Sequence, residues 1–422
     1  MTRLYKPGFR VVSLKQKSDL REASLDIFEK CYSWGEAREA QERGLYPYFK
    51  PIQESRGTRV IMEGKELIMA GSNNYLGLSW DPRVKEAALS ATKKWGTSCS
   101  GSRFLNGTLA IHEELEEHLA RFVGKQRALC FTTGYQTNLG AISALLGKDE
   151  HVFSDKLNHA SIMDGIFLAM GMRGKVKVHR YQHNDMASLE KYLSHEPNDV
   201  PKMVVTDGVF SMEGDIVKLP RMYELCRKYG ARLYLDEAHA IGVVGKTGRG
   251  TEEHYGVKDN TDIVMCTFSK SFGSLGGFIA GEDEVIDYIK HFARPLLFAA
   301  SMPPATIASV SACLDIIEKE PERVQRLQEI GRKMVAGFKA LGFDVGRAET
   351  PIVPLLVRDF EKTLLFWRAL FDGGVFTNPV LSPAVPPDST LIRTSYMAIH
   401  TDEELDTILS VAGEAGKKLG II

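Results

Sequence analysis

Several features are missing from this 422-residue sequence, and each absence excludes a class of function. No stretch approaches the 18 or so consecutive apolar residues of a membrane-spanning helix, and the N-terminus (MTRLYKPGFRVV) lacks the long apolar core of a secretory signal. The formal net charge is only −1, so no basic excess is present to hold a polyanion. We therefore expect no membrane span, no signal peptide and no nucleic-acid partner, while peripheral contact with the inner membrane stays open.

Cysteine is scarce and scattered. The six cysteines form no CxxC pair, and their spacing in a chain of this length is typical of reduced thiols in the cytoplasm. The sequence thus predicts a cytoplasmic location, with no disulfide framework and no metal site.

Apolar residues, in contrast, make up 44% of the chain, which is enough for large buried cores. Residues 1–55 are polar and mixed, and the pattern of SLDIFEKCYSWGEAREAQERG predicts one amphipathic helix that ends at Gly44. TRVIMEGKELIMAG predicts a hairpin that turns at Glu63-Gly64. We expect residues 1–55 to form an N-terminal helical segment.

Residues 56–295 have the sequence pattern of a large α/β domain. Short apolar, β-branched runs alternate there with helix-length segments, which favours a mostly parallel sheet buried on both faces. In such sheets ligands bind beyond the carboxyl ends of the strands. The runs are RALCFTT, HVFSD, KMVVTDGVF, ARLYLDEAH, DIVMCTFS and GGFIAG.

Residues 296–422 predict a smaller α+β domain. A long helix is expected over PPATIASVSACLDIIEKEPERVQRLQEIGRKMVAGFKALG, and the strands IVPLLVRD and LIRTSYM lie around a second helix. No internal repeat and no low-complexity tract interrupts the chain.

Reactive side chains follow the ends of the expected strands. RLYLDEAH ends in Asp236 and His239, DIVMCTFSK ends in Thr267, Ser269 and Lys270, CFTTGYQTN ends in Gly134-Tyr135, and HVFSDKLNH leads to His159. Taken singly, each has an ordinary interpretation: a solvated lysine, a turn-forming aspartate, a structural histidine. Their joint occurrence at one edge of a sheet favours a functional site.

These residue types share one chemistry. A helix start after glycine, with two hydroxyls beside it, suits a phosphate, and a buried carboxylate suits a cationic ring nitrogen. A desolvated lysine has a lowered pKa and forms a Schiff base with an aldehyde. Phosphate, pyridinium and aldehyde together describe pyridoxal 5′-phosphate (PLP).

The motifs around these residues resemble the α-oxoamine synthases, PLP enzymes of fold type I. The resemblance runs from about Tyr46 to the C-terminus and implies a large domain with a mostly parallel seven-stranded sheet and a smaller α+β C-terminal domain. It also implies the condensation of an amino acid with an acyl thioester and the loss of CO2. The motifs are NNYLGL, GSRFLNGTLAIHEELEEHLARF, FTTGYQTNLGAI, DKLNHASIMDGI, DGVFSMEGD, LDEAHAIGVVGKTGRG and TFSKSFGSLGG.

The resemblance assigns a role to each matched residue. Lys270 is the Schiff-base lysine, which also moves the Cα proton, and Asp236 pairs with the pyridine nitrogen. His239 binds the ring 3-oxygen, and His159 stacks on the ring and orients the substrate carboxylate. The remaining roles are phosphate binding by Gly134, Tyr135, Thr267 and Ser269, cofactor contact by Ser211, carboxylate binding by Arg393, and a substrate-side place for Asn74.

Family active sites lie at a homodimer interface, where a hydroxyl of the partner subunit reaches the phosphate. Here the matching segment is FAASMPP, which leaves Ser301 as the candidate and puts this contact in doubt.

Two flanking segments, GLYPYFKPIQES and NPVLSPAVPPDSTLIRTSYMAIHTDEEL, resemble the bacterial branch of the family that joins L-serine to palmitoyl-CoA. Branches that use alanine, glycine or a shorter acyl donor remain alternatives. The donor is acyl-CoA or an acyl carrier protein thioester, and the sequence does not distinguish them. A non-catalytic scaffold subunit is disfavoured because Lys270, Asp236, His159 and His239 are all present.

Overall fold

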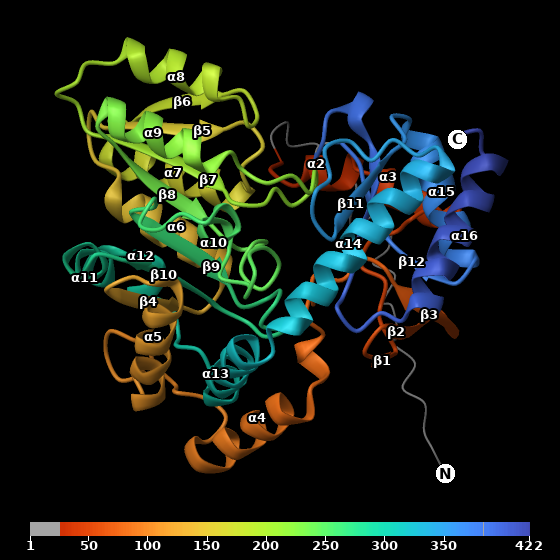
Figure 1. Ribbon diagram of the computed structural model, residues 1–422, viewed down its shortest axis with the longest axis horizontal. Coiled ribbons are helices and arrows are strands. Elements are labelled where there is room, and N and C mark those ends of the chain that lie inside the picture. The colour runs from red at the N-terminus through yellow and green to blue at the C-terminus, as the bar shows by residue number, and fades with distance from the viewer. Residues whose placement is uncertain (1–25, 383) are drawn as a thin grey trace. The chain divides into compact units, whose positions relative to one another are not determined.

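The structure is a computed structural model, and it describes residues 26–382 and 384–422 (Figure 1). The chain divides into two units, Met1–Tyr48 and Phe49–Ile422. In the part of the chain that the structure describes, no helix is long and apolar enough to cross a membrane.

Within residues 26–48, the described part of the first unit, the chain forms two short helices, α2 (Glu29–Ser33) and α3 (Glu36–Glu42). The prediction of one helix up to Gly44 is therefore wrong. Trp34 is extended (φ −77°, ψ 113°) and Gly35 takes the N-cap position of α3, so the i to i−4 ladder is interrupted between them. The start of the predicted helix, residues 24 and 25, lies outside the described residues.

The second unit is built around a seven-stranded sheet, in the order β4-β10-β9-β8-β7-β5-β6. β10 is antiparallel to both of its neighbours and the other pairs are parallel, which confirms the predicted mostly parallel sheet. The strands are β4 (Arg127–Phe131), β5 (His151–Asp155), β6 (Lys177–Tyr181), β7 (Lys202–Asp207), β8 (Ala231–Asp236), β9 (Ile263–Thr267) and β10 (Gly277–Gly281).

Of the seven strands of this sheet, the edge strand β6 is the one that no apolar run in the sequence predicted. It pairs only with β5, and most of its residues are exposed or half-buried. A strand at the edge of a sheet tolerates polar side chains, so KVHRY carries none of the continuous apolar signal of the buried strands.

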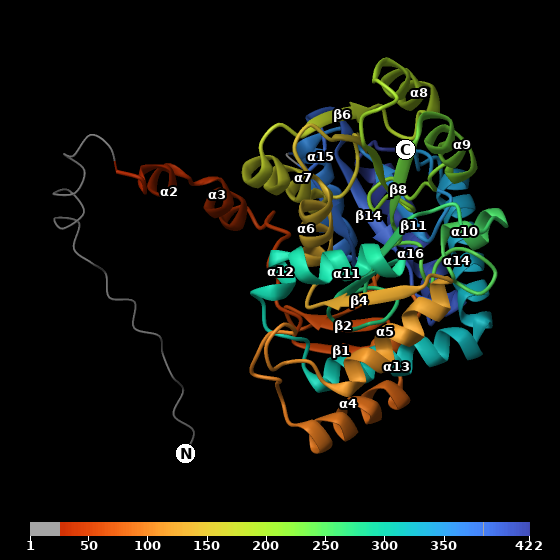
Figure 2. The same cartoon turned by 90° about the vertical axis from the view of Figure 1, so that its left-hand side faces the viewer.

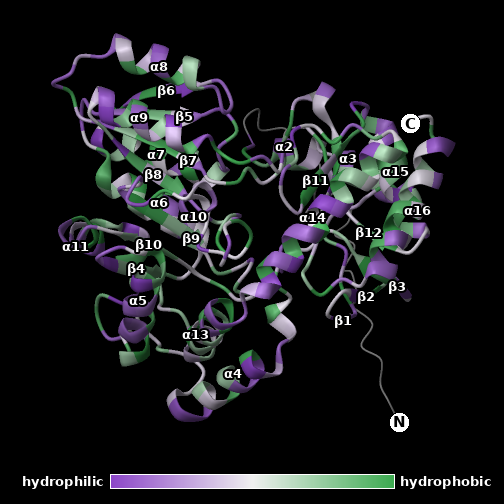
Figure 3. Cartoon of the chain, viewed as in Figure 1, coloured by the Kyte–Doolittle hydropathy of each residue, from purple (hydrophilic) through white to green (hydrophobic). Residues whose placement is uncertain are grey.

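Helices cover both faces of this sheet, and the strands between them are mainly hydrophobic (Figure 3). One face packs against α6, α7 and α11, the other against α8 and α9 at one end and α5 and α13 at the other. Figure 2 shows α11 and α12 on one side of β4 and α5 with α13 on the other. The helices are α4 (Pro82–Trp95), α5 (Ala110–Val123), α6 (Gly134–Leu145), α7 (Ala160–Arg173), α8 (Met186–His195), α9 (Leu219–Tyr229), α10 (Thr251–Tyr255), α11 (Asp283–Phe292), α12 (Arg294–Leu297) and α13 (Pro304–Lys319), with the 3-10 turn η1 (Leu78–Trp80).

Two smaller sheets share a separate core with three helices. The predicted hairpin at Glu63-Gly64 is confirmed, since Met62 pairs with Lys65 and both turn residues have positive φ. The elements are β1 (Glu54–Arg56), β2 (Arg59–Met62), β3 (Lys65–Met69), β11 (Ile352–Leu356), β12 (Val375–Phe376), β13 (Asn378–Val380), β14 (Leu391–Ser395), α14 (Pro321–Leu341), α15 (Phe360–Asp372), α16 (Asp402–Lys418) and the 3-10 turn η2 (Pro387–Ser389).

β3 pairs in parallel with β12, with Ile68 opposite Val375, so an early hairpin joins strands from the end of the chain. The domain limits 1–55, 56–295 and 296–422 stay predictions.

The long helix expected after residue 302 is two helices, α13 and α14, which meet at Glu320. Pro321 has no N–H to continue the ladder, and its ring excludes the carbonyl of the preceding turn, so it begins a new helix. The prediction of a single helix is wrong for this reason.

Candidate active site

The carboxyl ends of the parallel strands surround a cavity of about 260 Å³. Its lining residues come from β8, β9, the start of α6 and the loops after β5 and β7. Nine of the residues predicted from the sequence line it: Gly134, Tyr135, His159, Ser211, Asp236, His239, Thr267, Ser269 and Lys270.

Asp236 is held in place by neutral donors. Its Oδ2 accepts from Asn138 Nδ2 at 2.7 Å and its Oδ1 from the Ala238 amide at 2.9 Å. Asn138 in turn accepts from the hydroxyl of Tyr234 at 2.8 Å. Since Asp236 is only 3% exposed and these partners carry no charge, the carboxylate suits a cationic group that enters from the cavity.

Lys270 follows β9 at the same edge of the sheet. Desolvation lowers the pKa of its amine to about 8, although the nearby carboxylates Asp236 and Asp207 oppose the shift. Its side chain is partly accessible because it borders the cavity, and protein surrounds it elsewhere. An amine with this pKa is available as a nucleophile or base near neutral pH.

A second carboxylate lies beside Asp236. Asp207 ends β7 directly opposite Asp236 in the register, and burial together with the charge of Asp236 raises its pKa well above the usual range. Asp207 Oδ2 accepts from the His159 amide at 3.0 Å, which ties the loop after β5 to the end of β7.

His239 is buried and bonded to a residue distant in the sequence. The hydroxyl of Tyr75 lies 2.7 Å from its Nδ1, so Nε2 is the ring nitrogen that remains for a ligand. Burial first, and the charges of Lys270 and Arg393 next, lower the pKa of His239 well below its usual range. The imidazole is therefore neutral, and it can donate or accept one hydrogen bond toward the cavity.

The start of α6 forms a cradle for an anion. A Cβ on Gly134 would lie 2.5 Å from Thr267 Oγ1, so only glycine permits this approach of the helix to β9. Thr267 Oγ1 lies 2.9 Å from Ser269 Oγ, which places two hydroxyls beside the first amides of the helix. This combination is typical of a phosphate site.

The other predicted residues that line the cavity make different hydrogen bonds. His159 is exposed and caps α7, and its Nδ1 lies 2.7 Å from Ser161 Oγ. The hydroxyl of Tyr135 bonds Asp164. Ser211 lines the cavity, and its carbonyl accepts from Arg393.

Arg393 does not line the cavity but lies behind it. The side chain is 5% exposed, and Nε donates to Ser211 O at 2.5 Å while Nη2 donates to Asn73 Oδ1 at 3.0 Å and approaches the Tyr75 hydroxyl at 3.4 Å. All of these acceptors are neutral, and Arg393 forms no ion pair with any residue in 26–382 or 384–422. A buried guanidinium without a carboxylate partner favours an anionic ligand.

The structure places Asn74 and Ser301 outside the cavity lining. Asn74 Nδ2 donates to Ser79 Oγ at 2.8 Å, whereas its neighbour Asn73 contacts Arg393. Ser301 is buried against Gly107, and its amide donates to Gly101 O. Their substrate and cross-subunit roles stay predictions.

The sequence reasoning missed Asn138, Tyr75, Asn73 and Asp207. Asn138 had a usable signal: it is an amide one turn after Gly134, so it lies on the same face of the helix as that glycine. Tyr75 and Asn73 stand within NNYLGL, but only tertiary contact shows which side chain faces Arg393.

A second cluster lies at the opposite, amino end of β5. Its members are His151, His179 and Glu196, whose ligand atoms lie close enough to hold a metal ion. His151 Nδ1 is 3.1 Å from Glu196, and none of the predicted site residues belongs to this group.

The cavity residues fit PLP. The cradle at Gly134 suits its phosphate, Asp236 its ring nitrogen, and Lys270 its aldehyde, while Arg393 is left for the anionic group of a substrate.

Comparison with known proteins agrees with this fit. The model of the family "aminotransferase class I and II" matches residues 65–411. A serine palmitoyltransferase from Sphingobacterium spiritivorum is 48% identical over 380 residues, 90% of this chain and 94% of that protein. An 8-amino-7-oxononanoate synthase from Thermoanaerobacter pseudethanolicus is 40% identical over 385 residues, 91% of this chain and 96% of that protein.

The fold is also similar to that of a solved structure. A variant of the serine palmitoyltransferase from S. paucimobilis with bound PLP-myriocin aldimine superimposes with a TM-score of 0.89 at 35% identity, and covers 94% of this chain and 100% of that chain.

Proposed function

Because this chain belongs to the class I and II aminotransferase family, and within it to the α-oxoamine synthases, we propose that it is a PLP-dependent serine palmitoyltransferase. It would join L-serine to a long-chain acyl thioester such as palmitoyl-CoA with loss of CO2. The product is 3-oxosphinganine, the first intermediate of sphingolipid synthesis. The observation that carries the proposal is one reactive amine, Lys270, whose charged neighbours include the buried acid Asp236 and the unpaired cation Arg393.

PLP, when bound, supplies an aldehyde that joins amines and a ring that accepts the electron pair left at the substrate α-carbon. Lys270 would hold the cofactor at rest and, once the substrate amine has replaced it, remove the α-proton. Asp236 would keep the ring nitrogen protonated, and its orientation is fixed by Asn138.

Arg393 and His159 would orient the amino acid. The guanidinium of Arg393 would bind a carboxylate by charge-assisted hydrogen bonds, because its present acceptors are all neutral and leave its charge unpaired. With the carboxylate held there, Lys270 would be the base that takes the α-proton. Holding both substrates in one reactive geometry is a large entropic contribution to such a reaction.

The amino acid and the acyl donor decide between serine palmitoyltransferase and its relatives. The identity to serine palmitoyltransferase exceeds the identity to 8-amino-7-oxononanoate synthase, 48% against 40% over a similar length, which supports L-serine as the substrate. The alternative is another α-oxoamine synthase, such as 8-amino-7-oxononanoate synthase or 2-amino-3-oxobutyrate CoA ligase.

The test is a titration of the PLP-loaded protein with L-serine, L-alanine and glycine, followed by palmitoyl-CoA. We expect the visible cofactor absorption to respond at the lowest concentration to serine, and palmitoyl-CoA then to release free thiol. A preference for alanine or glycine would transfer the function to a related enzyme. The same assay with palmitoyl-acyl carrier protein identifies the donor.

We also propose a homodimer with the active site at its interface, in the cytoplasm and at most in peripheral contact with the inner membrane. The six cysteines are all unpaired, which supports a reducing compartment. Light scattering of the purified protein should give about twice the chain mass of 46.9 kDa. A mass of one chain at micromolar concentration would contradict this assembly.

A further inference from the structure

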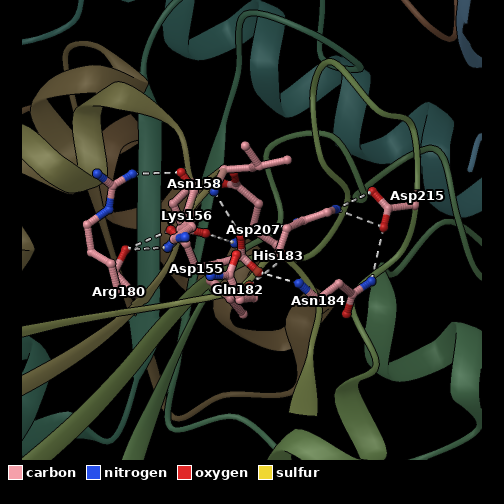
Figure 4. A network of polar contacts seen from close by, with 12 residues as sticks. Asp155, Lys156, Asn158, Arg180, Gln182, His183, Asn184, Asp207 and Asp215 are labelled. Atoms are coloured by element: carbon pink, nitrogen blue, oxygen red, sulfur yellow. Dashed lines mark hydrogen bonds and ion pairs between the residues drawn. The ribbon is translucent and has the colours of Figure 1, made fainter. Parts of the chain in front are cut away.

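His183 joins two loops that lead into the active site. It follows β6, and its Nδ1 lies 3.1 Å from Asp155 Oδ1 while its Nε2 lies 3.1 Å from Asp215 Oδ2 (Figure 4). Asp155 ends β5, directly before the loop that carries His159, and Asp215 belongs to the loop after β7 that carries Ser211.

Both ring nitrogens of His183 must donate in this arrangement. A carboxylate only accepts hydrogen bonds, so an imidazole that serves two of them is an imidazolium. The charged groups that face it are Asp155, Asp215 and Glu213. Burial alone would lower the pKa of His183, but the hydrogen bonds and charges of the two aspartates outweigh it and raise the pKa to about 9.

The loop 208–217 carries this connection to Arg393. Val209 pairs with Ile216, and the Gly214 amide donates to Phe210 O at 2.9 Å, so the loop is a tight turn with Asp215 and Ser211 close to its tip. The carbonyl of Ser211 accepts from Arg393 Nε. A shift of the loop therefore moves an acceptor that fixes the guanidinium.

His183 is the cationic partner of Asp215, which is only 2% exposed. The other side-chain donor to Asp215 is Asn184 Nδ2 at 3.0 Å, a neutral amide. Phe210 of the same loop packs edge-on against the His183 ring, with centroids 4.4 Å apart. Without the imidazolium, the buried carboxylate of Asp215 would keep only the neutral Asn184 amide as a side-chain donor among the described residues. The loop would then have to move so that water could solvate this carboxylate.

We propose that protonated His183 is a positioning residue that holds the loop 208–217, and through it Arg393, in place for the carboxylate of the amino-acid substrate. This inference rests on the proposed function, since it assumes an amino acid at Arg393. It adds a residue more than a hundred positions from Arg393 to the determinants of substrate affinity.

The pH dependence follows from the direction of the shift. The pKa of His183 is raised from 6.5 to about 9, so its contribution is fully present below pH 6.5 and is lost as the pH rises through 9. Binding of the amino acid should weaken over the same range. Asp215→Asn leaves no buried charge in the loop when His183 loses its proton, so most of this weakening should disappear.

The experiment measures the Kd of L-serine from the cofactor absorption between pH 6.5 and 9.5. At pH 7.5, His183→Gln should raise this Kd about tenfold, the equivalent of one buried hydrogen bond, and change the PLP affinity less than about twofold. Asp215→Asn should remove most of the loss of serine affinity that the wild type shows between pH 7.5 and 9.5. Serine's own amino group titrates identically in all variants, so a difference in pH dependence between variants belongs to the protein.

His151→Gln is the matched control, because His151 is a buried histidine paired with a carboxylate at the other end of β5. It should leave the serine Kd unchanged. Hydrogen–deuterium exchange of the cofactor-free protein should be faster over residues 208–217 in His183→Gln than in the wild type, and unchanged there in His151→Gln.

Three results would overturn the proposal: an unchanged serine Kd in His183→Gln, an equal weakening in His151→Gln, or a pH dependence in Asp215→Asn equal to that of the wild type. If His183→Gln does not fold, the pH dependence in Asp215→Asn decides. If the wild type prefers alanine or glycine, the proposed substrate fails, and His183 is tested with that amino acid instead.

Discussion

Replacing Lys270 with alanine should abolish both the covalent attachment of PLP and turnover. Among the described residues no other lysine lines the cavity, and the roles proposed for Lys270 include the base, which alone contributes about 10²- to 10⁴-fold to such reactions. We expect turnover to fall by at least about 10³-fold. Borohydride reduction of the PLP-loaded protein, followed by mass spectrometry, should find the cofactor on the Lys270 peptide of the wild type and on no peptide of the variant.

Lys202→Ala is the matched control for this experiment. Lys202 is also a buried lysine of the seven-stranded sheet, but it begins β7 at the end opposite the cavity, and its Nζ donates to Pro197 O. It should keep full cofactor attachment and near-normal turnover. Turnover that survives in Lys270→Ala would disprove the assigned role.

The lowered pKa of Lys270 gives the same experiment a pH dependence. Since desolvation lowers the pKa to about 8, the amine of the cofactor-free protein is mostly protonated below that pH and mostly neutral above it. Only the neutral amine attacks an aldehyde. The rate of PLP attachment should rise with pH up to about 8 and then level off. With an ordinary lysine the rate would go on rising for about two more pH units.

Much of this site could be predicted because the parallel sheet collects it. The site residues stand at or just after the ends of four strands that are distant from one another in the sequence, but the carboxyl ends of these strands lie at one edge of the sheet. The four strands end at Phe131, Asp155, Asp236 and Thr267. Continuous apolar runs marked those strands, so the residues after them could be placed together before any coordinates.

The rest depends on information that local patterns do not contain. NNYLGL presents Asn73, Asn74 and Tyr75 in succession, and only packing shows that Asn73 and Tyr75 contact Arg393 while Asn74 contacts Ser79. β6 was missed because its edge position tolerates polar side chains. The break at Pro321, in contrast, was readable, since proline cannot continue a helix.

Arg393 should control the affinity for the amino acid and little else. Its guanidinium is buried and contacts neutral acceptors alone among residues 26–382 and 384–422, so the substrate carboxylate would be its anionic partner. Losing such a pair costs about 3 kcal/mol, which corresponds to a change of roughly 100-fold. We expect Arg393→Met to raise the KM and Kd of L-serine by about this factor and to leave the KM of the acyl donor within about threefold.

Arg393→Lys separates charge from geometry. An ammonium keeps the charge but has three N–H donors in place of five, so it cannot replace the contacts to Ser211 O, Ser395 Oγ and Asn73 Oδ1 and still bind the carboxylate. The serine KM should therefore rise about tenfold, between the wild type and the methionine variant. Arg127→Lys is the control, because this strand arginine is already paired with Asp283 and Asp287 and should tolerate the change. A serine KM that is unchanged in Arg393→Met would mean that the carboxylate binds elsewhere, and the buried charge would then need another anion.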